Sequence, residues 1–188
     1  MPLMGSVPTR PHDEAVQARI FKALHEVALA ASGVLDPAEL ARLTIEHART
    51  LLGGDTSTLY WWEPDEARLV RIVSTNDRIN DLHSQLSSGE GVAGEAFSSG
   101  RPIVVDDYLT YGNARPEMVE LGIRSAIALP LVAQDRSLGV LLVATSRPRR
   151  WQESDVDLLR LFAAQITPAI EAARLTAYST VDSSPSPW

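Results

Sequence analysis

Apolar residues near the start of the chain recur at the spacing of an α-helix. The first stripe, with intervals of three or four residues, consists of Val16, Ile20, Leu24, Val27 and Ala31. This pattern predicts an amphipathic helix over residues 13–31. Asp36 can then cap a second helix with Pro37 at its first position, and that helix should end before Gly53 and Gly54.

The middle of the chain has the shorter patterns that are typical of β-strands. Thr56–Glu63, which is rich in β-branched and aromatic residues, and Arg68–Ser74 predict one hairpin. Residues 125–133 and 137–145 predict a second hairpin, and a short strand is expected at residues 102–105. The segment LGVLLVAT in the second hairpin is continuously apolar, as expected of a central strand that is covered on both faces.

The C-terminal part of the chain predicts one long helix over residues 152–178. Its main apolar stripe has heptad spacing and consists of Val156, Leu159, Ala163, Ile166, Ile170, Ala173 and Ala177. A second stripe consists of Leu158, Leu161, Phe162, Ala169 and Ala172. The helix could pack on its own sheet with one stripe and on a partner with the other, or both could be covered within the chain. Pro168 should kink it.

Helices at both ends and an antiparallel meander between them indicate an α+β domain with a sheet of about five or six strands. The terminal helices should cover one face of that sheet. The other face is left for the glycine-rich residues 89–107 and for the irregular, aromatic-bearing residues 108–120. A sheet face that is roofed by loops and short helices favours a small-molecule pocket.

The glycine-rich segment begins with GEGVAG, which has the spelling of a dinucleotide-binding turn. Such a turn follows a strand and opens a long helix. Here the preceding residues 81–88 are polar and not strand-like, and the helical residues 92–99 make barely two turns. Glu90 also places a negative charge where a pyrophosphate would lie. The segment is therefore interpreted as a pocket wall and not as a nucleotide site.

Composition and charge exclude several classes of partner. The chain has 188 residues, of which 45% are hydrophobic and 22% are charged, with a net charge of −7. The largest basic cluster is Arg147, Arg149 and Arg150, which argues against nucleic acid as a main partner. Neither a membrane span nor a secretory signal is apparent, so we expect a cytoplasmic location.

Conventional catalytic groups are also missing from the sequence. It contains no cysteine, which excludes disulfides, thiol nucleophiles and thioether-linked cofactors. Its four histidines have no paired metal-ligand spacing. No nucleophile–base pair can be named, so the sequence predicts a protein that is not an enzyme.

Six pieces of the sequence, in this order, resemble the GAF domain family of sensory modules. They are Gly89–Gly94, GRP at residues 100–102, Asp106-Asp107, GIRSAIALPL at residues 122–131, LGVL at residues 138–141, and Trp151 before QESD. The likeness covers about residues 14–176. It implies a mostly non-catalytic domain that binds a cyclic nucleotide, bilin, haem or metabolite on the roofed sheet face. It also implies dimerisation through the terminal helices.

This chain departs from several subgroups of that family. Without cysteine it is not expected to hold a covalent bilin or to act as a methionine sulfoxide reductase of this fold. The asparagine-lysine-phenylalanine-aspartate-glutamate signature of cyclic-nucleotide members does not appear. His83 is the histidine placed as some haem-binding members place their axial ligand, but its polar neighbours favour a solvated side chain. The ligand and any cofactor stay unidentified.

The resemblance and the expected topology together give a set of pocket candidates. They are Trp61, Gly91, Val92, Gly94, Phe97, Asp106, Asp107, Tyr108, Tyr111, Arg124 and Ser125. Asp106 and Asp107 could bind a polar ligand or cap the following turn. Arg124 could hold a ligand anion or pair with Asp106. Trp61 and Trp62 are adjacent in a strand and must point to opposite faces, which leaves open which one meets the pocket.

The predicted function is that of a sensory domain that binds a small molecule and signals to an output kinase, phosphatase or cyclase. The dimer-interface candidates are Val16, Ile20, Leu24, Leu159, Ile166 and Ile170. We expect a flexible tail at residues 1–11, the GAF domain at 12–176 and a disordered tail at 177–188. The alternatives are a dimerisation module that binds no ligand and a haem sensor that uses His83.

Overall fold

The structure is a computed structural model that describes residues 18, 21–23, 25, 26, 37–82 and 85–180. Within the last helix, the side chains of residues 162, 165, 166, 173, 174 and 176–180 are also outside the description. Four sequence candidates therefore lie outside the described residues, namely Val16, Ile20, Leu24 and His83. The same holds for the predicted tail at residues 1–11.

The described residues form one antiparallel sheet of six strands in the order β3-β2-β1-β6-β5-β4. The strands are β1 Thr56–Glu63, β2 Arg68–Ser74, β3 Gln85–Leu86, β4 Ile103–Val105, β5 Ser125–Ala133 and β6 Arg136–Thr145. Both hairpins that the sequence predicts are present, and β1 pairs with β6 to join them at the centre. The predicted α+β architecture is confirmed.

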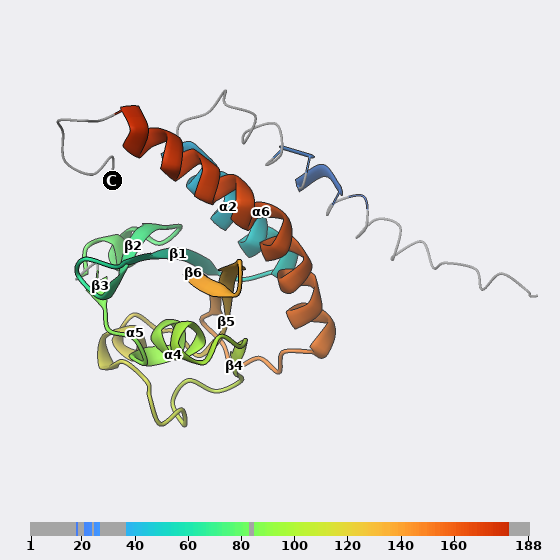
Figure 1. The fold of residues 1–188 in the computed structure, drawn as a ribbon. Helices are drawn as coiled ribbons and strands as arrows, with labels where there is room; N and C mark the ends of the chain where they lie inside the picture. Colours follow the sequence, from blue (N-terminus) through green and yellow to red (C-terminus); the bar gives the residue numbers. More distant parts are fainter. Residues whose placement is uncertain (1–17, 19–20, 24, 27–36, 83–84, 181–188) are drawn as a thin grey trace, which may run out of the picture.

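The helices lie on both sides of this sheet (Figure 1). They are α2 Pro37–Leu52, α3 Asp77–Asn80, α4 Gly91–Ser99, α5 Pro116–Glu120 and α6 Glu153–Thr180. In Figure 1, α2 and α6 run side by side over one face, and α4 and α5 lie against the other. We call these the helix face and the loop face. Among the described residues, no helix is long and apolar enough to cross a membrane.

The helix face carries a core of large aliphatic side chains. The strands contribute Leu59, Trp61, Ile127, Leu129, Leu131, Leu141 and Val143. The helices contribute Leu40, Ile45, Ala48, Leu52, Leu159, Ala163 and Ile170. Because alternate residues of a strand point to opposite faces, Ile127, Leu129 and Leu131 of β5 and Leu141 and Val143 of β6 all belong to this core.

This core corrects part of the predicted dimer interface. Leu159 and Ile170 are almost fully buried against the chain's own sheet, so they are not available to a partner. The heptad spacing of α6 is thus used, as far as its side chains are described, to pack inside the chain. Ile166 lies in α6, but its side chain is outside the description. The helix continues through Pro168, and its first and last turns run in different directions in Figure 1.

Three short elements were not predicted from the sequence, and one boundary differs. β3 lies inside residues 81–88, which we expected to be non-strand, and pairs with β2 at Leu69 and Val70. α3 and α5 have only four and five residues, too few to show helical periodicity. α6 extends to Thr180, two residues beyond the end of the predicted helix.

Candidate functional site

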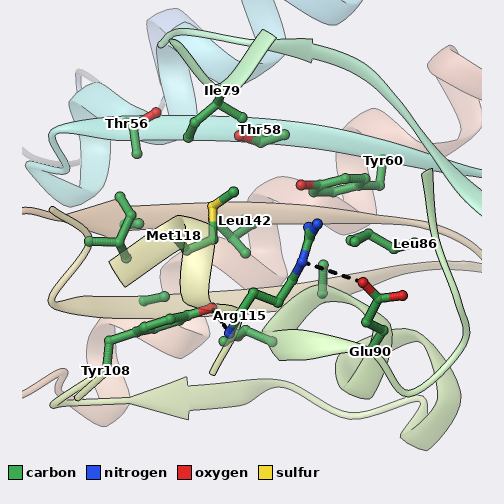
Figure 2. Close-up of a pocket in the computed structure, with 15 residues that line it drawn as sticks. Thr56, Thr58, Tyr60, Ile79, Leu86, Glu90, Tyr108, Arg115, Met118 and Leu142 are labelled. Atoms are coloured by element: carbon green, nitrogen blue, oxygen red, sulfur yellow. Dashed lines mark hydrogen bonds and ion pairs between the residues drawn. The ribbon is translucent and has the colours of Figure 1, made fainter. Parts of the chain in front are cut away.

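The loop face encloses a cavity between the sheet and the segments that cover it (Figure 2). The sheet contributes Thr56, Thr58, Tyr60, Leu86, Ala126, Leu142 and Ala144. The covering segments contribute Ile79, Glu90, Val92, Ala93, Tyr108, Arg115, Met118 and Ile123. The wall is mostly apolar, with a few polar groups, which is the usual character of a small-molecule site.

Strand alternation explains why the cavity forms on this face. The even-numbered residues Thr56, Thr58 and Tyr60 of β1 point toward it, and so do Ala126 of β5 and Ala144 of β6. Alanine side chains at these two positions are too short to reach the roof. On the helix face, the neighbouring positions Ile127 and Val143 carry larger side chains that are buried in the core. The free space therefore follows from side-chain size along alternate strand positions.

The free space is small as the structure stands. The cavity volume is about 30 Å³, which is room for a few water molecules. The side chains of Arg115 and Met118 reach into the cavity from the covering segment, toward the sheet (Figure 2). A larger occupant would require these two side chains to move.

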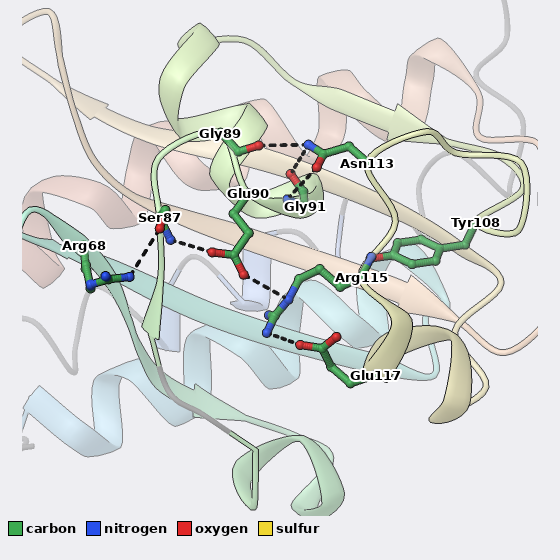
Figure 3. A network of polar contacts seen from close by, with 9 residues as sticks. All are labelled: Arg68, Ser87, Gly89, Glu90, Gly91, Tyr108, Asn113, Arg115 and Glu117. Carbon is green, nitrogen blue, oxygen red and sulfur yellow. Dashed lines mark hydrogen bonds and ion pairs between the residues drawn. The ribbon is translucent and has the colours of Figure 1, made fainter.

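Arg115 forms the charged end of the cavity. Its side chain is only 12% exposed, and its Nε lies 3.4 Å from the Glu90 carboxylate. Its Nη2 pairs with the Glu117 carboxylate on the first turn of α5. The backbone N–H of Arg115 donates to the Tyr108 hydroxyl at 3.3 Å. Figure 3 shows the guanidinium between the two carboxylates.

The segment that carries Arg115 is tied to the glycine-rich turn through Asn113 (Figure 3). The Asn113 amide donates to the carbonyl of Gly89 at 2.9 Å and accepts from the N–H of Gly91 at 3.3 Å. Nearby, the Tyr111 hydroxyl donates to the Glu95 carboxylate of α4. These polar contacts add to the apolar contacts that the roof makes with α4.

Two glycines of this turn have a structural use. Gly91 has φ +62°, and a Cβ atom there would lie about 3 Å from the Arg115 side chain. A Cβ atom on Gly94 would lie 2.5 Å from the backbone oxygen of Ser87. The glycines therefore let the turn and the roof approach each other, and they do not line the cavity.

The two tyrosines of the wall are held neutral. Burial raises the pKa of Tyr60, even though the nearby Arg71 and Arg115 cations oppose this effect. Burial also raises the pKa of Tyr108, against the hydrogen bond from the Arg115 N–H. Both phenols are therefore available as hydrogen-bond donors and acceptors over the physiological pH range.

Some sequence candidates lie at the cavity, and others lie beside it. Val92 and Tyr108 line the wall. Phe97 stacks on Trp62 with ring centroids 4.5 Å apart, on the same sheet face but outside the cavity. Tyr111 lies near the cavity, but its hydroxyl donates to the Glu95 carboxylate.

Two pocket candidates on the strands face the wrong side of the sheet. Trp61 packs in the core of the helix face, so Trp62 is the tryptophan that looks toward α4. Ser125 is fully buried, and its hydroxyl lies 2.6 Å from that of Thr145. Strand phase decides both cases, because each residue is one position away from a cavity-facing one.

The three charged candidates serve the backbone and do not reach the cavity. Asp106 accepts from the N–H of Trp151 at 3.0 Å and so fixes the start of α6. Asp107 accepts from the N–H of Leu109 at 3.0 Å, which is the turn-capping alternative. Arg124 does not pair with Asp106: its guanidinium donates to the carbonyls of Val119 and Ile123.

Sequence reasoning missed the charged residue of the cavity itself. Arg115 lies in a stretch without periodicity, so no hydrophobic pattern predicts its burial. The one available signal was Glu90, an acid inside a glycine turn, which makes sense beside a cation. Within the part of the chain that the structure describes, no cluster of histidine and acidic side chains could hold a metal ion.

Comparisons with known proteins agree with this architecture. The chain is 26% identical over 167 residues to the circadian input-output histidine kinase CikA of Thermosynechococcus vestitus. The match covers 81% of this chain but only 23% of the kinase, so the chain spans about a quarter of that relative.

Two solved structures have the same fold. One is the GAF domain of a phosphoenolpyruvate-protein phosphotransferase from Coxiella burnetii, with TM-score 0.72, 19% identity, and coverage of 86% of this chain and 98% of that one. The other is the free methionine-R-sulfoxide reductase of Neisseria meningitidis in complex with its substrate, with TM-score 0.74, 20% identity, and coverage of 91% and 97%. The family model described as "GAF domain" matches residues 34–171, and the chain belongs to the GAF domain family.

Proposed function

We propose that this chain is a non-catalytic, cytoplasmic sensory domain that binds a small molecule in the cavity of the loop face. The observation that carries the proposal is a mostly apolar cavity with one buried cation, under a roof held by polar contacts. A roof of this kind can open without disturbing the aliphatic core on the opposite face. The Neisseria reductase, which has this fold, was solved with its substrate, which supports small-molecule binding.

The proposed output is a kinase or another signalling domain, in the same chain or in a partner. The relative CikA is a histidine kinase, and a neighbour from Geobacter sulfurreducens is a GAF domain/HD domain protein. Dimerisation through the helix layer is part of this proposal. The exposed apolar side chains Leu161 and Leu175 lie on α6, although the predicted residues Leu159 and Ile170 do not contribute.

A second candidate is a dimerisation module whose cavity is filled by its own side chains. The cavity volume is only about 30 Å³, which favours this alternative. It predicts a stable dimer that carries no bound compound. The haem sensor that uses His83 is a weaker alternative, because the sequence neighbours of His83 are polar and favour a solvated side chain.

Native mass spectrometry of freshly purified protein, with an absorbance spectrum beside it, separates these functions. A dimer with a stoichiometric extra mass supports the sensor and gives the mass of its ligand. A dimer at the mass of the bare chain, unchanged after incubation with cell extract, supports the dimerisation module. A Soret band would support the haem sensor, and a colourless protein expressed with haem available would exclude it.

A further inference from the structure

The chemistry of Arg115 identifies the kind of molecule that the cavity can take. Its guanidinium is a buried cation, with 12% of the side chain exposed, at one end of an otherwise largely apolar space. Burying a charge is costly unless an opposite charge is close by. In the structure the opposite charges are the carboxylates of Glu90 and Glu117, which lie at the rim of the cavity.

The three charged groups differ in their freedom to move. The side chains of Glu90 and Glu117 are 40% and 36% exposed, so their carboxylates can turn into water at little cost. The base of Arg115 is fixed, because its N–H donates to Tyr108 and its aliphatic part lies directly over Gly91. The cation can therefore remain at this end of the cavity while its two partners turn away, and rotation of the outer part of the Arg115 side chain and of Met118 would make room for the ligand.

The groups around the guanidinium fit a small anion with an apolar body. The neutral hydroxyls of Thr58 and Tyr60 lie on the floor nearby, and Met118, Ala126 and Leu142 form the apolar part of the wall (Figure 2). A carboxylate matches the two parallel N–H groups of a guanidinium. A dianion such as phosphate is less suitable, because the displaced carboxylates remain at the rim and repel a second negative charge.

We propose that the cavity takes a small carboxylate with an apolar body, whose carboxylate replaces Glu90 and Glu117 on Arg115. This inference rests on the proposed function, since it assumes that the cavity binds a ligand. It also connects binding with the roof, because the Glu90 carboxylate that would be displaced accepts from the N–H of Ser87 at 3.0 Å. Occupancy would thus loosen Glu90 from Arg115 and change how the glycine-rich turn is held.

The test compares benzoate with benzamide, its uncharged counterpart of nearly the same shape, by isothermal titration of the full chain. Wild type should bind benzoate more tightly than benzamide. Arg115→Met should weaken benzoate about tenfold or more, as for loss of a charge-assisted hydrogen bond, and leave benzamide almost unchanged. Glu90→Gln should strengthen benzoate several-fold, because it removes a competitor for the cation. Arg101→Met, at an exposed arginine, is the matched control and should change neither.

Arg115→Met should weaken benzoate binding, and Glu90→Gln should strengthen it. If the two residues had only a structural role, both substitutions should weaken benzoate binding. Circular dichroism shows whether Arg115→Met folds, and the Glu90→Gln result stands by itself if it does not. Equal binding of benzoate and benzamide would overturn the anion preference and leave the cavity as a binding site. Binding of neither probe, by wild type or Glu90→Gln at millimolar concentration, would overturn the inference. The native mass measurement still decides the proposed function in both cases.

Discussion

The sheet face that carries α2 and α6 is packed with leucine, isoleucine and valine, whereas the central strands present mainly alanine, threonine and tyrosine, with Val140 and Leu142, to the face under α4 and α5. Both faces are formed by the same central strands, so the difference comes only from alternate positions along β1, β5 and β6. The helices cover the first face with apolar contacts. The second is covered by a smaller apolar cluster that includes Val92, Ala96 and Ile123, together with hydrogen bonds and ion pairs around Asn113 and Arg115.

This difference separates stability from binding within one domain. Buried aliphatic surface supplies most of the free energy of folding, and here it is concentrated on the helix face. Polar contacts at a partly exposed roof contribute less, and each can be exchanged for contacts with water or ligand. The loop face can therefore change its state while the helix face keeps the sheet intact.

The neighbouring leucines of β6 allow the largest test of this comparison. Leu141 is fully buried on the helix face, and Leu142 lines the cavity on the loop face. Leu141→Ala should lower the free energy of unfolding by about 3–4 kcal/mol, because it leaves a void in a closed core. Leu142→Ala should cost less than about 2 kcal/mol, because it enlarges a space that already exists. Chemical denaturation of both variants measures the difference.

The affinity for benzoate should respond in the opposite way: Leu142→Ala should have the larger effect. Leu142→Ala should change the affinity for benzoate, since the side chain belongs to the cavity wall. Leu141→Ala should leave the affinity of the folded fraction unchanged. Equal losses of stability in the two variants would mean that the loop face is as closed as the helix face, contrary to our comparison.

The second prediction concerns the approach of the glycine-rich turn to α4. Gly94→Ala should destabilise the protein by roughly 1–3 kcal/mol, because its Cβ atom would lie 2.5 Å from the Ser87 backbone oxygen. Gly112→Ala is the control, because a Cβ atom there meets nothing within 4 Å. Thermal unfolding compares the two. A Gly94→Ala protein as stable as Gly112→Ala would show that the turn adapts freely.

The third prediction tests the attachment of the roof. Asn113→Ala removes donors to Gly89 and an acceptor for Gly91, and should cost about 1 kcal/mol. The larger effect should be local: backbone amides of residues 108–122 should exchange hydrogen faster, while those of β1 and β6 stay protected. Mass-spectrometric hydrogen exchange measures both. Uniform acceleration over the whole sheet would indicate that the roof is part of the main core.

The same contrast explains what the sequence could predict. α2, both long hairpins and α6 came from hydrophobic periodicity, because each buries a long apolar face against the others. Their bounds agree with the structure to within one or two residues. The short elements α3, β3 and α5 follow no period, because they are held by their neighbours and by turns.

The site was predicted as a region but not as a set of residues. The roofed sheet face was predicted correctly, and Val92 and Tyr108 do line the cavity. Trp61 and Ser125 were assigned to the wrong face, because the phase of a strand that is covered on both sides does not appear in its sequence. Arg115 was missed because an arginine in an aperiodic segment is usually exposed, and its burial depends on contacts from distant residues.

The last prediction has the smallest expected effect and compares polar contacts on the helix face with those on the loop face. On the helix side, Asp55 joins the end of α2 to the end of β6 by accepting from the N–H and the hydroxyl of Ser146, both at 2.7 Å. These bonds lower the pKa of Asp55 below the ordinary aspartate value of 3.8. The ionised carboxylate therefore stabilises the fold above that pH, and the contribution is lost as the pH falls through the lowered pKa.

Asp55→Asn should accordingly lower the melting temperature by roughly 1–2 °C at neutral pH, since the group is exposed and screened by solvent. The difference from wild type should shrink as the pH is lowered from about 5 toward 3. Asn113→Ala should show no such convergence from its own bonds, because an amide does not titrate in this range. Melting curves of the three proteins from pH 3 to 7 make the comparison. A constant gap for Asp55→Asn would mean that the shape of the side chain, and not its charge, fastens the helix layer.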